Sequence, residues 1–220
     1  CKKINIELTE KQIKQFMDYK DMLLEWNEKF NLTAITEKDK IELLHFKDSI
    51  LPEDLIKQNA TVLDIGSGAG FPAIPLKIVR DDLDITMVDS LNKRVTFLNE
   101  VISKLNLERA KAVHKRAEDL DKNVKYDVVT ARAVAPMRVL CEYCIPFVKK
   151  GGIMLAYKSE DVEEELNQAQ KAIDVLGGKL LKTETRNLGE IVRKFVIIEK
   201  VKESPLSYPR GGNKPRLKPL

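Results

Sequence analysis

The segment VLDIGSGAGFPAIP, residues 62–75, places three glycines at alternate positions directly after an apolar run that contains an aspartate. The apolar start is typical of a buried strand, and 72–79 predicts a helix, since prolines are tolerated in a helix's first turn. Gly66 can adopt a positive φ that a side chain would resist, while Gly68 and Gly70 let a ligand approach the backbone closely. The segment therefore predicts a strand–turn–helix unit whose turn either holds a ligand or is simply tight.

The patterns that follow this segment alternate between strands and helices. Apolar residues at helical spacing from Val95 to Leu105 and from Val162 to Leu176 predict two further helices. Six further strand patterns lie at 84–90, 110–119, 126–134, 151–158, 179–186 and 193–200. This alternation predicts an α/β fold with a mostly parallel, doubly wound sheet of seven strands, the last two of which form a hairpin.

Before the first strand, the sequence predicts helices. Thr9 and Gln12 form a capping-box pattern ahead of an amphipathic stretch, which NLTAIT at 31–36 interrupts. A second helix is expected to open at 36–39 and to stop near Pro52. We therefore expect an N-terminal helical extension of the sheet domain.

Composition limits the class of protein. The 220 residues include no apolar run near the roughly 20 needed to cross a bilayer, and the first residues lack a signal-peptide pattern. Three cysteines cannot build a disulfide framework, so we expect the reducing environment of the cytoplasm and no membrane partner.

The basic surplus of the chain lies at its C-terminal end. Residues 201–220 carry five basic side chains against Glu203 alone. A cationic, Pro/Gly-rich end suits a polyanion such as nucleic acid, although a solubilising tail would have the same composition. The candidate RNA-binding side chains of this tail are Arg210, Lys214, Arg216 and Lys218.

The glycine turn is compatible with two cofactor classes. A dinucleotide fingerprint, G-x-G-x-x-G, would need glycine where this chain has Phe71. Asp64 would oppose a pyrophosphate but could accept a hydrogen bond from an ammonium. The pattern D-x-G-x-G-x-G is instead that of S-adenosylmethionine (AdoMet) methyltransferases, so we expect AdoMet and not a nicotinamide dinucleotide to bind.

Acidic residues at the next two strand ends favour the same cofactor. Asp89 ends the second strand, where a carboxylate can accept hydrogen bonds from both ribose hydroxyls. Ala117 and Glu118 follow the third strand, where backbone and side chain could contact an adenine edge. Each acid could equally be a solvated loop residue, but acids at successive strand ends of such a sheet predict one site.

Several ordered motifs resemble the ribosomal RNA small subunit methyltransferase G (glucose-inhibited division protein B) family. They run from about residue 26 to the C-terminus and are NLTAI, HFKDSI, LDIGSGAGFPAIPLKI, VDSLNKRVTFL, RAEDL, YDVVTARAVAP and YPRGGNKP. The chain departs from the family at Ala73, which replaces a glycine, and at Lys47, which replaces the leucine of H-F-L-D-S.

The resemblance implies a Rossmann-like class I AdoMet-dependent methyltransferase that methylates N7 of a guanine in small-subunit (16S) ribosomal RNA. With the patterns above, we expect three parts of the chain: a helical extension (1–58), an AdoMet-binding methyltransferase domain (59–202) and a basic tail (203–220). The cofactor contacts that it implies are Gly66, Phe71, Ala117, Glu118 and Arg132.

Methylation at N7 of guanine needs positioning and charge stabilisation but no general base, because N7 has a lone pair and no proton to lose. No catalytic residue is therefore certain, and Arg132 and Arg138 are the candidates. Arg132 could instead form a structural salt bridge. Arg138 and Lys158 could hold RNA phosphates or be ordinary solvated side chains.

The remaining residues with reactive or titratable side chains are expected to have structural roles. Cys141 and Cys144 form a C-x-x-C pattern on a helical stretch with no second pair, so buried packing is expected and no metal site. His45 is expected at the edge of the core rather than in catalysis.

Three classes of function remain open on the residues alone. The expected one is an RNA methyltransferase acting on small-subunit ribosomal RNA, free or in an assembled subunit, without an obligatory protein partner. The second is a methyltransferase for a protein or small molecule, since the cofactor motif does not identify the acceptor. The third is a non-enzymatic RNA-binding protein with the same fold.

Overall fold

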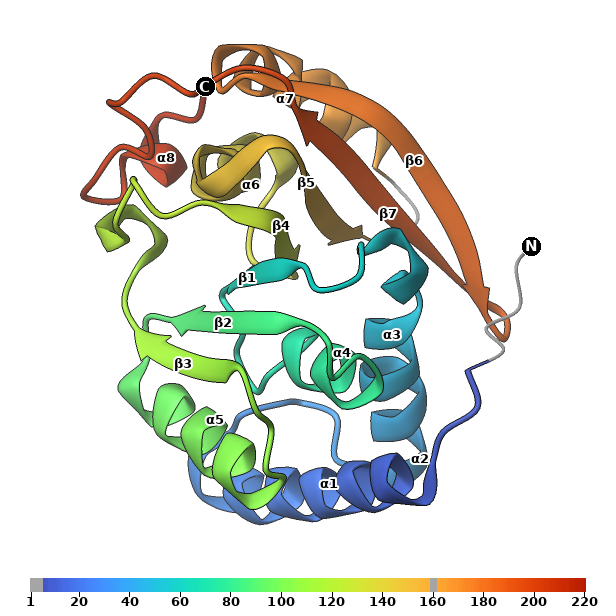
Figure 1. Cartoon of the computed structure of the whole chain (residues 1–220). Coiled ribbons are helices and arrows are strands. Elements are labelled where there is room, and N and C mark those ends of the chain that lie inside the picture. The colour runs from blue at the N-terminus through green and yellow to red at the C-terminus, as the bar shows by residue number, and fades with distance from the viewer. Residues whose placement is uncertain (1–5, 159–161) are drawn as a thin grey trace.

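The computed structural model describes residues 6–158 and 162–220, and its centre is a seven-stranded sheet within these ranges (Figure 1). The strand order is β3-β2-β1-β4-β5-β7-β6. The strands are β1 (Thr61–Ile65), β2 (Asp84–Asp89), β3 (Ala110–His114), β4 (Tyr126–Arg132), β5 (Val148–Lys158), β6 (Gly178–Leu188) and β7 (Ile191–Lys200). Strands β1 to β5 pair in parallel, and β7 pairs antiparallel with β5 and β6. The predicted parallel sheet with a final hairpin is confirmed.

Helices cover both faces of this sheet (Figure 1). The α-helices are α1 (Glu10–Phe30), α2 (Lys38–Ile41), α3 (Asp48–Ile50), α4 (Ala73–Val79), α5 (Asn92–Lys104), α6 (Met137–Cys144), α7 (Glu163–Val175) and α8 (Lys214–Leu217). A π-helical stretch, Glu42–Lys47, joins α2 to α3, and single 3-10 turns occur at Glu53–Leu55, Ala117–Asp119 and Ile145–Phe147. The second predicted helix, expected to stop near Pro52, therefore consists of α2, the π-helical stretch and α3 in succession. Its middle part is π-helical instead of α-helical.

The strands send alternate side chains to two separate apolar cores. On β1, Val62 enters the core beneath α1, α4 and α5, whereas Leu63 and Ile65 enter the core beneath α6 and α7. The two-residue period of a strand imposes this alternation, and a strand buried on both faces therefore reads as a continuous apolar run. The stretch VLDI, with which the segment 62–75 begins, is largely such a run and lies in β1.

The N-terminal helices are packed beneath the glycine turn. Helix α1 begins with the predicted capping box, in which the Thr9 side chain accepts from the backbone of Gln12 while the Gln12 side chain accepts from the backbone of Thr9. Tyr19 is fully buried and donates a 2.5 Å hydrogen bond to the carbonyl of Ala69, inside the turn. Gln15 donates to the carbonyl of Leu105 at 2.8 Å. The extension thus supports the loop that follows β1.

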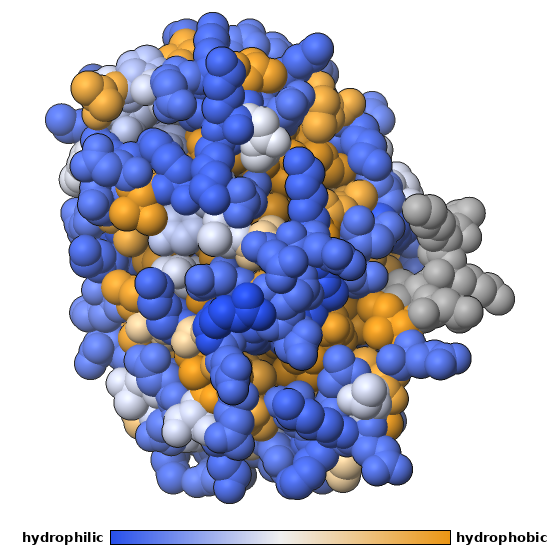
Figure 2. Space-filling view, in the orientation of Figure 1, coloured by the Kyte–Doolittle hydropathy of each residue, from blue (hydrophilic) through white to orange (hydrophobic). Residues whose placement is uncertain are grey.

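The C-terminal segment returns to the sheet domain and lies beside α6, as Figure 1 shows for α8. Tyr208 and Leu220 pack on the core beneath α6 and α7. On the face seen in Figure 2, hydrophilic residues predominate and hydrophobic ones lie among them. Among the helices of the described residues, none is long and apolar enough to cross a membrane.

Candidate functional site

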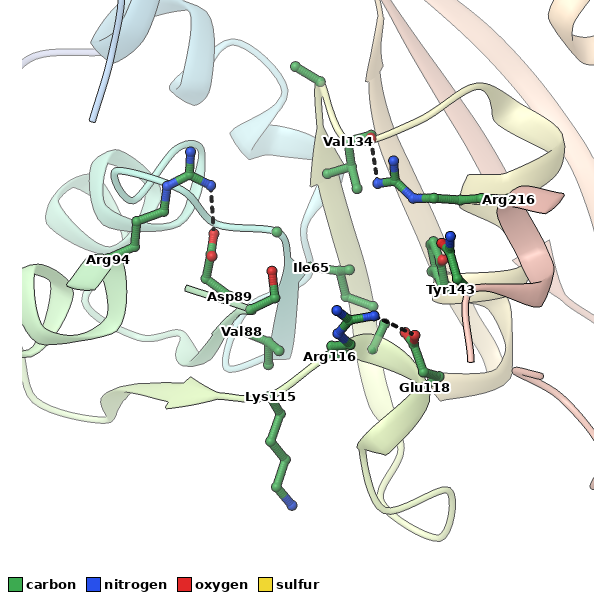
Figure 3. A pocket seen from close by; sticks show the side chains of 15 residues that line it. Ile65, Val88, Asp89, Arg94, Lys115, Arg116, Glu118, Val134, Tyr143 and Arg216 are labelled. Atoms are coloured by element: carbon green, nitrogen blue, oxygen red, sulfur yellow. Dashed lines mark hydrogen bonds and ion pairs between the residues drawn. The ribbon is translucent and has the colours of Figure 1, made fainter. Parts of the chain in front are cut away.

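A pocket of about 530 Å³ opens at the carboxyl ends of the parallel strands (Figure 3). It lies where the chain order reverses between β1 and β4, which is the usual ligand site of an open α/β sheet. Its volume is in the range of small-molecule sites. The lining residues are Ile65, Gly66, Val88, Asp89, Ser90, Arg94, Lys115, Arg116, Ala117, Glu118, Ala133, Val134, Tyr143, Asn213 and Arg216.

The glycine turn forms the floor of this pocket at Gly66, whose φ is +72°. The backbone N–H groups of Gly66 and Ser67 both donate to the carbonyl of Val88, at 2.8 and 3.1 Å. A side chain at Gly66 would place its Cβ 2.8 Å from Cγ2 of Val134, which also lines the pocket. Glycine is required at this position both for its backbone conformation and because Val134 already occupies the space that a side chain would need.

Asp89 joins the turn to the end of β2. One carboxylate oxygen accepts from the backbone of Gly68 at 2.9 Å and lies 3.4 Å from the guanidinium of Arg94. The other oxygen accepts from the backbone of Leu91 at 2.9 Å. The side chain is 3% exposed and lines the pocket, so it is held rigidly in place where a hydroxyl-bearing ligand could reach it.

Asp64 lies buried beneath the same turn. Its Oδ1 accepts from the Thr130 hydroxyl at 2.8 Å, whereas Oδ2 has no hydrogen-bond partner among the described residues. Burial raises the pKa of Asp64 to about 7, against the lowering effect of the nearby Ser67 and Thr130 hydroxyls. The Ser67 hydroxyl donates to the backbone carbonyl of Asp64 at 3.1 Å and leaves Oδ2 unpaired. An unpaired buried carboxylate oxygen is costly, so this atom is suited to a cation that arrives with a ligand.

The opposite wall of the pocket carries a second polar group. Burial and the nearby Glu118 carboxylate raise the pKa of Tyr143, which lines this wall beside Arg216. Arg116 lies 3.9 Å from Glu118. Ala117 and Glu118, which the sequence placed at an adenine edge, do line the pocket here.

Arg132 ends β4 but points away from this lining. Its guanidinium donates to Asp48 at 2.8 Å, to the carbonyl of Leu44 at 3.3 Å and to Nδ1 of His45 at 2.9 Å. It also lies over the ring of Phe71, 5.1 Å from the ring centre. Asp48 and His45 belong to the HFKDS motif, so this motif holds the end of β4.

His45 is neutral and fully engaged in this network. Its ring stacks on Phe71 at 4.2 Å, and its pKa is lowered to about 4 by burial and by the charge of Arg132. Because a guanidinium can only donate, Nδ1 of His45 accepts and Nε2 carries the proton toward the Thr33 hydroxyl, 2.8 Å away. The histidine at the core edge thus has no free nitrogen for proton transfer.

The other predicted site residues are distributed around the pocket. Gly70 is buried against Tyr19 and Leu98, behind the turn rather than on the pocket wall. Lys158 is ion-paired with Glu165 at 2.6 Å. The remaining basic candidates divide into Arg210, which is paired with Glu142, and the exposed Arg138, Lys214 and Lys218, for which the described ranges record no ion pair.

Cys141 and Cys144 are buried in α6, as expected for packing residues. Burial raises the pKa of Cys141 to about 12, which keeps its thiol protonated. In residues 6–158 and 162–220, no group of three or more His, Cys, Asp or Glu side chains is placed to hold a metal ion.

Sequence reasoning missed several residues of the pocket. Ser90, Arg94 and Lys115 immediately follow or neighbour the strand ends that were singled out, so their positions could have been inferred from the same rule. Tyr143 and Asn213 come from α6 and the C-terminal segment. Neither lies in a motif whose spacing points to a cofactor.

Comparison with known proteins gives one family. The family model described as rRNA small subunit methyltransferase G matches residues 12–194. A protein named ribosomal RNA small subunit methyltransferase G from Lactobacillus helveticus is 50% identical over 228 residues, 99% of this chain and 95% of the relative. A Staphylococcus aureus protein of the same name is 50% identical over 226 residues, 100% of this chain and 95% of the relative.

Solved structures share the fold at low sequence identity. The structure of M. jannaschii TYW2 in complex with AdoMet has a TM-score of 0.59 at 17% identity, covering 71% of this chain and 76% of that one. NSun6 from Pyrococcus horikoshii with SFG has a TM-score of 0.59 at 15% identity, covering 78% and 57%. The expected class I AdoMet-dependent methyltransferase fold is confirmed.

Proposed function

The chain belongs to the rRNA small subunit methyltransferase G family, and we propose that it methylates N7 of a guanine in small-subunit ribosomal RNA with AdoMet as the methyl donor. The observation that carries the cofactor assignment is the strand-end pocket with the unpaired oxygen of Asp64 beneath its floor. A ligand with an ammonium group would satisfy that oxygen, whereas a pyrophosphate would be repelled by it.

The residues at the pocket fit this cofactor. Gly66 leaves room for a ligand against the backbone, Asp89 offers a fixed carboxylate to hydroxyl groups, and Ala117 with Glu118 lines the far end. Asp64 would neutralise the ammonium. When bound, AdoMet supplies a methyl group on a positively charged sulfur, which makes that carbon electrophilic.

The protein's contribution to the transfer is to bind and orient. Guanine N7 presents its lone pair in the plane of the base and loses no proton, so no side chain has to act as a base. The site agrees with this requirement, since His45 uses both ring nitrogens in hydrogen bonds and Asp64 would be paired with the ammonium of the cofactor. Arg132 orders the end of β4 through Asp48 and His45, and we assign it a positioning role.

The RNA itself is proposed to contact exposed basic side chains around the pocket mouth. Arg138 lies in the first turn of α6, Lys214 is the first residue of the short helix α8, and Lys218 follows that helix. All three are exposed, so their charges are available to phosphates. Lys158, Arg210 and Arg216 are engaged in contacts within the protein and are less suited to this role.

The triple change Arg138→Gln, Lys214→Gln and Lys218→Gln is expected to weaken RNA binding and flatten its salt dependence. Each phosphate neutralised on single-stranded RNA adds about −0.7 to the slope of log K against log salt. Loss of three such contacts should therefore make the slope less negative by up to about 2. AdoMet affinity should not change. RNA affinity measured at several salt concentrations checks this, and equal slopes for the variant and the wild type would place the RNA contacts elsewhere.

The proposed function is tested with labelled AdoMet and ribosomal small subunits, with protein-free ribosomal RNA in parallel. Nucleoside analysis should show the label in 7-methylguanosine, and the two substrates show whether free or assembled RNA is used. Label in ribosomal proteins would favour a protein methyltransferase, and AdoMet binding without any transfer would favour a non-enzymatic RNA-binding protein. The proposal includes a cytoplasmic location and no obligatory protein partner.

A further inference from the structure

The C-terminal segment 208–220, here called the strap, is fastened to α6 by one ion pair. The backbone N–H and Nε of Arg210 donate to Oε1 of Glu142 at 2.9 and 2.8 Å, and Nη2 donates to Oε2 at 2.6 Å. The side chain of Glu142 is 0% exposed. In the described part of the chain, each hydrogen bond recorded to this carboxylate comes from Arg210.

Such a pair acts as a latch because its buried half, Glu142, is not stable without a partner. A buried carboxylate without a partner is strongly destabilising, so releasing the strap would leave the charge of Glu142 uncompensated. The bidentate geometry also fixes the direction of the Arg210 side chain. Glu142 therefore holds the strap in one position relative to α6.

Within the strap, contacts transmit this position to Arg216. Arg210 also donates to the carbonyl of Lys218 at 2.9 Å, which closes the strap on itself. Between these points, Asn213 adopts a left-handed conformation, and its carbonyl accepts from the backbones of Arg216 and Leu217 at 3.1 and 3.2 Å. The short helix that carries Arg216 is thus fixed from both sides.

The middle of the strap reaches the pocket. Asn213 and Arg216 line it, and the Arg216 guanidinium donates to the carbonyl of Val134 at 3.4 Å. Figure 3 shows Arg216 and Tyr143 on the side of the pocket opposite Asp89 and Arg94. The segment therefore completes a wall that the strand ends leave open.

We propose that the strap is part of the cofactor site, that Arg216 contributes to AdoMet binding, and that the Glu142–Arg210 pair is the positioning element that places it. The inference rests on the proposed function for the identity of the ligand. The composition of the tail alone predicts that Arg210 and Arg216 bind RNA phosphates. The proposal instead assigns both side chains to the cofactor pocket.

The test is calorimetric titration of AdoMet into the full-length protein without RNA. Arg216→Ala, which leaves the latch intact, should weaken binding about tenfold, as expected for one lost charge-assisted hydrogen bond. Glu142→Gln should weaken it by at least as much. Leu217→Ala is the matched control, since this neighbouring side chain is 73% exposed and not part of the lining, and its affinity should equal that of the wild type.

A second readout follows the strap directly. Trypsin can cleave after Arg210 and after Arg216, which precede Gly211 and Leu217. AdoMet should slow cleavage of the wild type, and Glu142→Gln should accelerate it in the absence of ligand, because opening of the strap exposes these bonds. If Glu142→Gln fails to fold, the AdoMet affinity of Arg216→Ala and the protection of the wild-type strap from trypsin by AdoMet still test the proposal.

The outcomes separate the two proposals. Failure of the wild type to bind AdoMet would contradict the proposed function. Wild-type binding with unchanged affinity in Arg216→Ala, and no protection of the strap by AdoMet, would overturn the inference and leave the proposed function standing.

Discussion

Replacing Gly66 by valine is expected to abolish AdoMet binding while the sheet domain remains folded. At φ +72° a β-branched residue is strained by about 1–3 kcal/mol, which is smaller than the 5–15 kcal/mol that stabilises a typical domain. The larger effect is local, since the new Cβ would lie 2.8 Å from Cγ2 of the neighbouring Val134, which lines the pocket and would have to shift. Affinity should fall at least about 100-fold by calorimetry, with the circular dichroism spectrum unchanged.

Gly189→Val is the matched control for this change. Gly189 has a φ of +65° and lies in the turn between β6 and β7, and a Cβ added there meets no atom within 4 Å. Both variants thus introduce similar backbone strain, but only Gly66→Val collides with a side chain that lines the pocket. A Gly66→Val protein that binds AdoMet as tightly as Gly189→Val would show that the ligand lies elsewhere.

The glycine turn was predictable because its causes are local. The apolar run, the alternate glycines and the helix-compatible prolines in 61–79 each act on neighbouring residues, and the structure has the expected strand, turn and helix there. The same holds for the capping box at Thr9. The rule that ligands bind at strand ends then extended this local information to Asp89, Ala117 and Glu118, all of which line the pocket.

Contacts between distant segments were not predictable in this way. The insertion of β7 between β5 and β6 is a choice of tertiary pairing, and a hairpin pattern is compatible with either order. The pairing of Arg132 with Asp48 joins residues 84 positions apart, and that of Arg210 with Glu142 joins residues 68 apart. A count of charged residues treats such arginines as cations available to a ligand. The fold shows that each is already paired with a carboxylate of the protein.

Asp64→Asn is expected to stabilise the ligand-free protein above neutral pH. The pKa of Asp64 is raised from 3.8 to about 7 on folding, chiefly by burial, so between these values the unfolded chain loses a proton that the folded protein keeps. The stability of the wild type therefore falls as pH rises through this window, by about 4 kcal/mol for a difference of about three pKa units. Asparagine does not titrate and carries no such cost.

Denaturant unfolding of both proteins at pH 4 and pH 8 measures this effect. The difference in unfolding free energy should shift in favour of Asp64→Asn by about 4 kcal/mol between the two pH values, whatever the amide itself costs at either one. Other titrating groups are shared by the two proteins and cancel in the comparison. A difference that does not change with pH would mean that the Asp64 carboxylate is already charged and compensated in the folded state.

The same substitution is expected to weaken AdoMet binding, because an amide cannot neutralise an ammonium. The loss should be at least about tenfold, the usual effect of removing the charged partner of a buried hydrogen bond. At pH 6 the wild type should also release close to one proton on binding, since the arriving cation lowers the pKa of a carboxyl that is protonated in the free protein. Calorimetry at pH 6 in buffers of different ionisation enthalpy measures this release, which Asp64→Asn should lack. If Asp64→Asn gains stability at high pH and loses AdoMet affinity, Oδ2 of Asp64 is an acceptor that stays unpaired until the ligand binds. Unchanged affinity in the variant and no proton release by the wild type would instead restrict Asp64 to its hydrogen bond with Thr130.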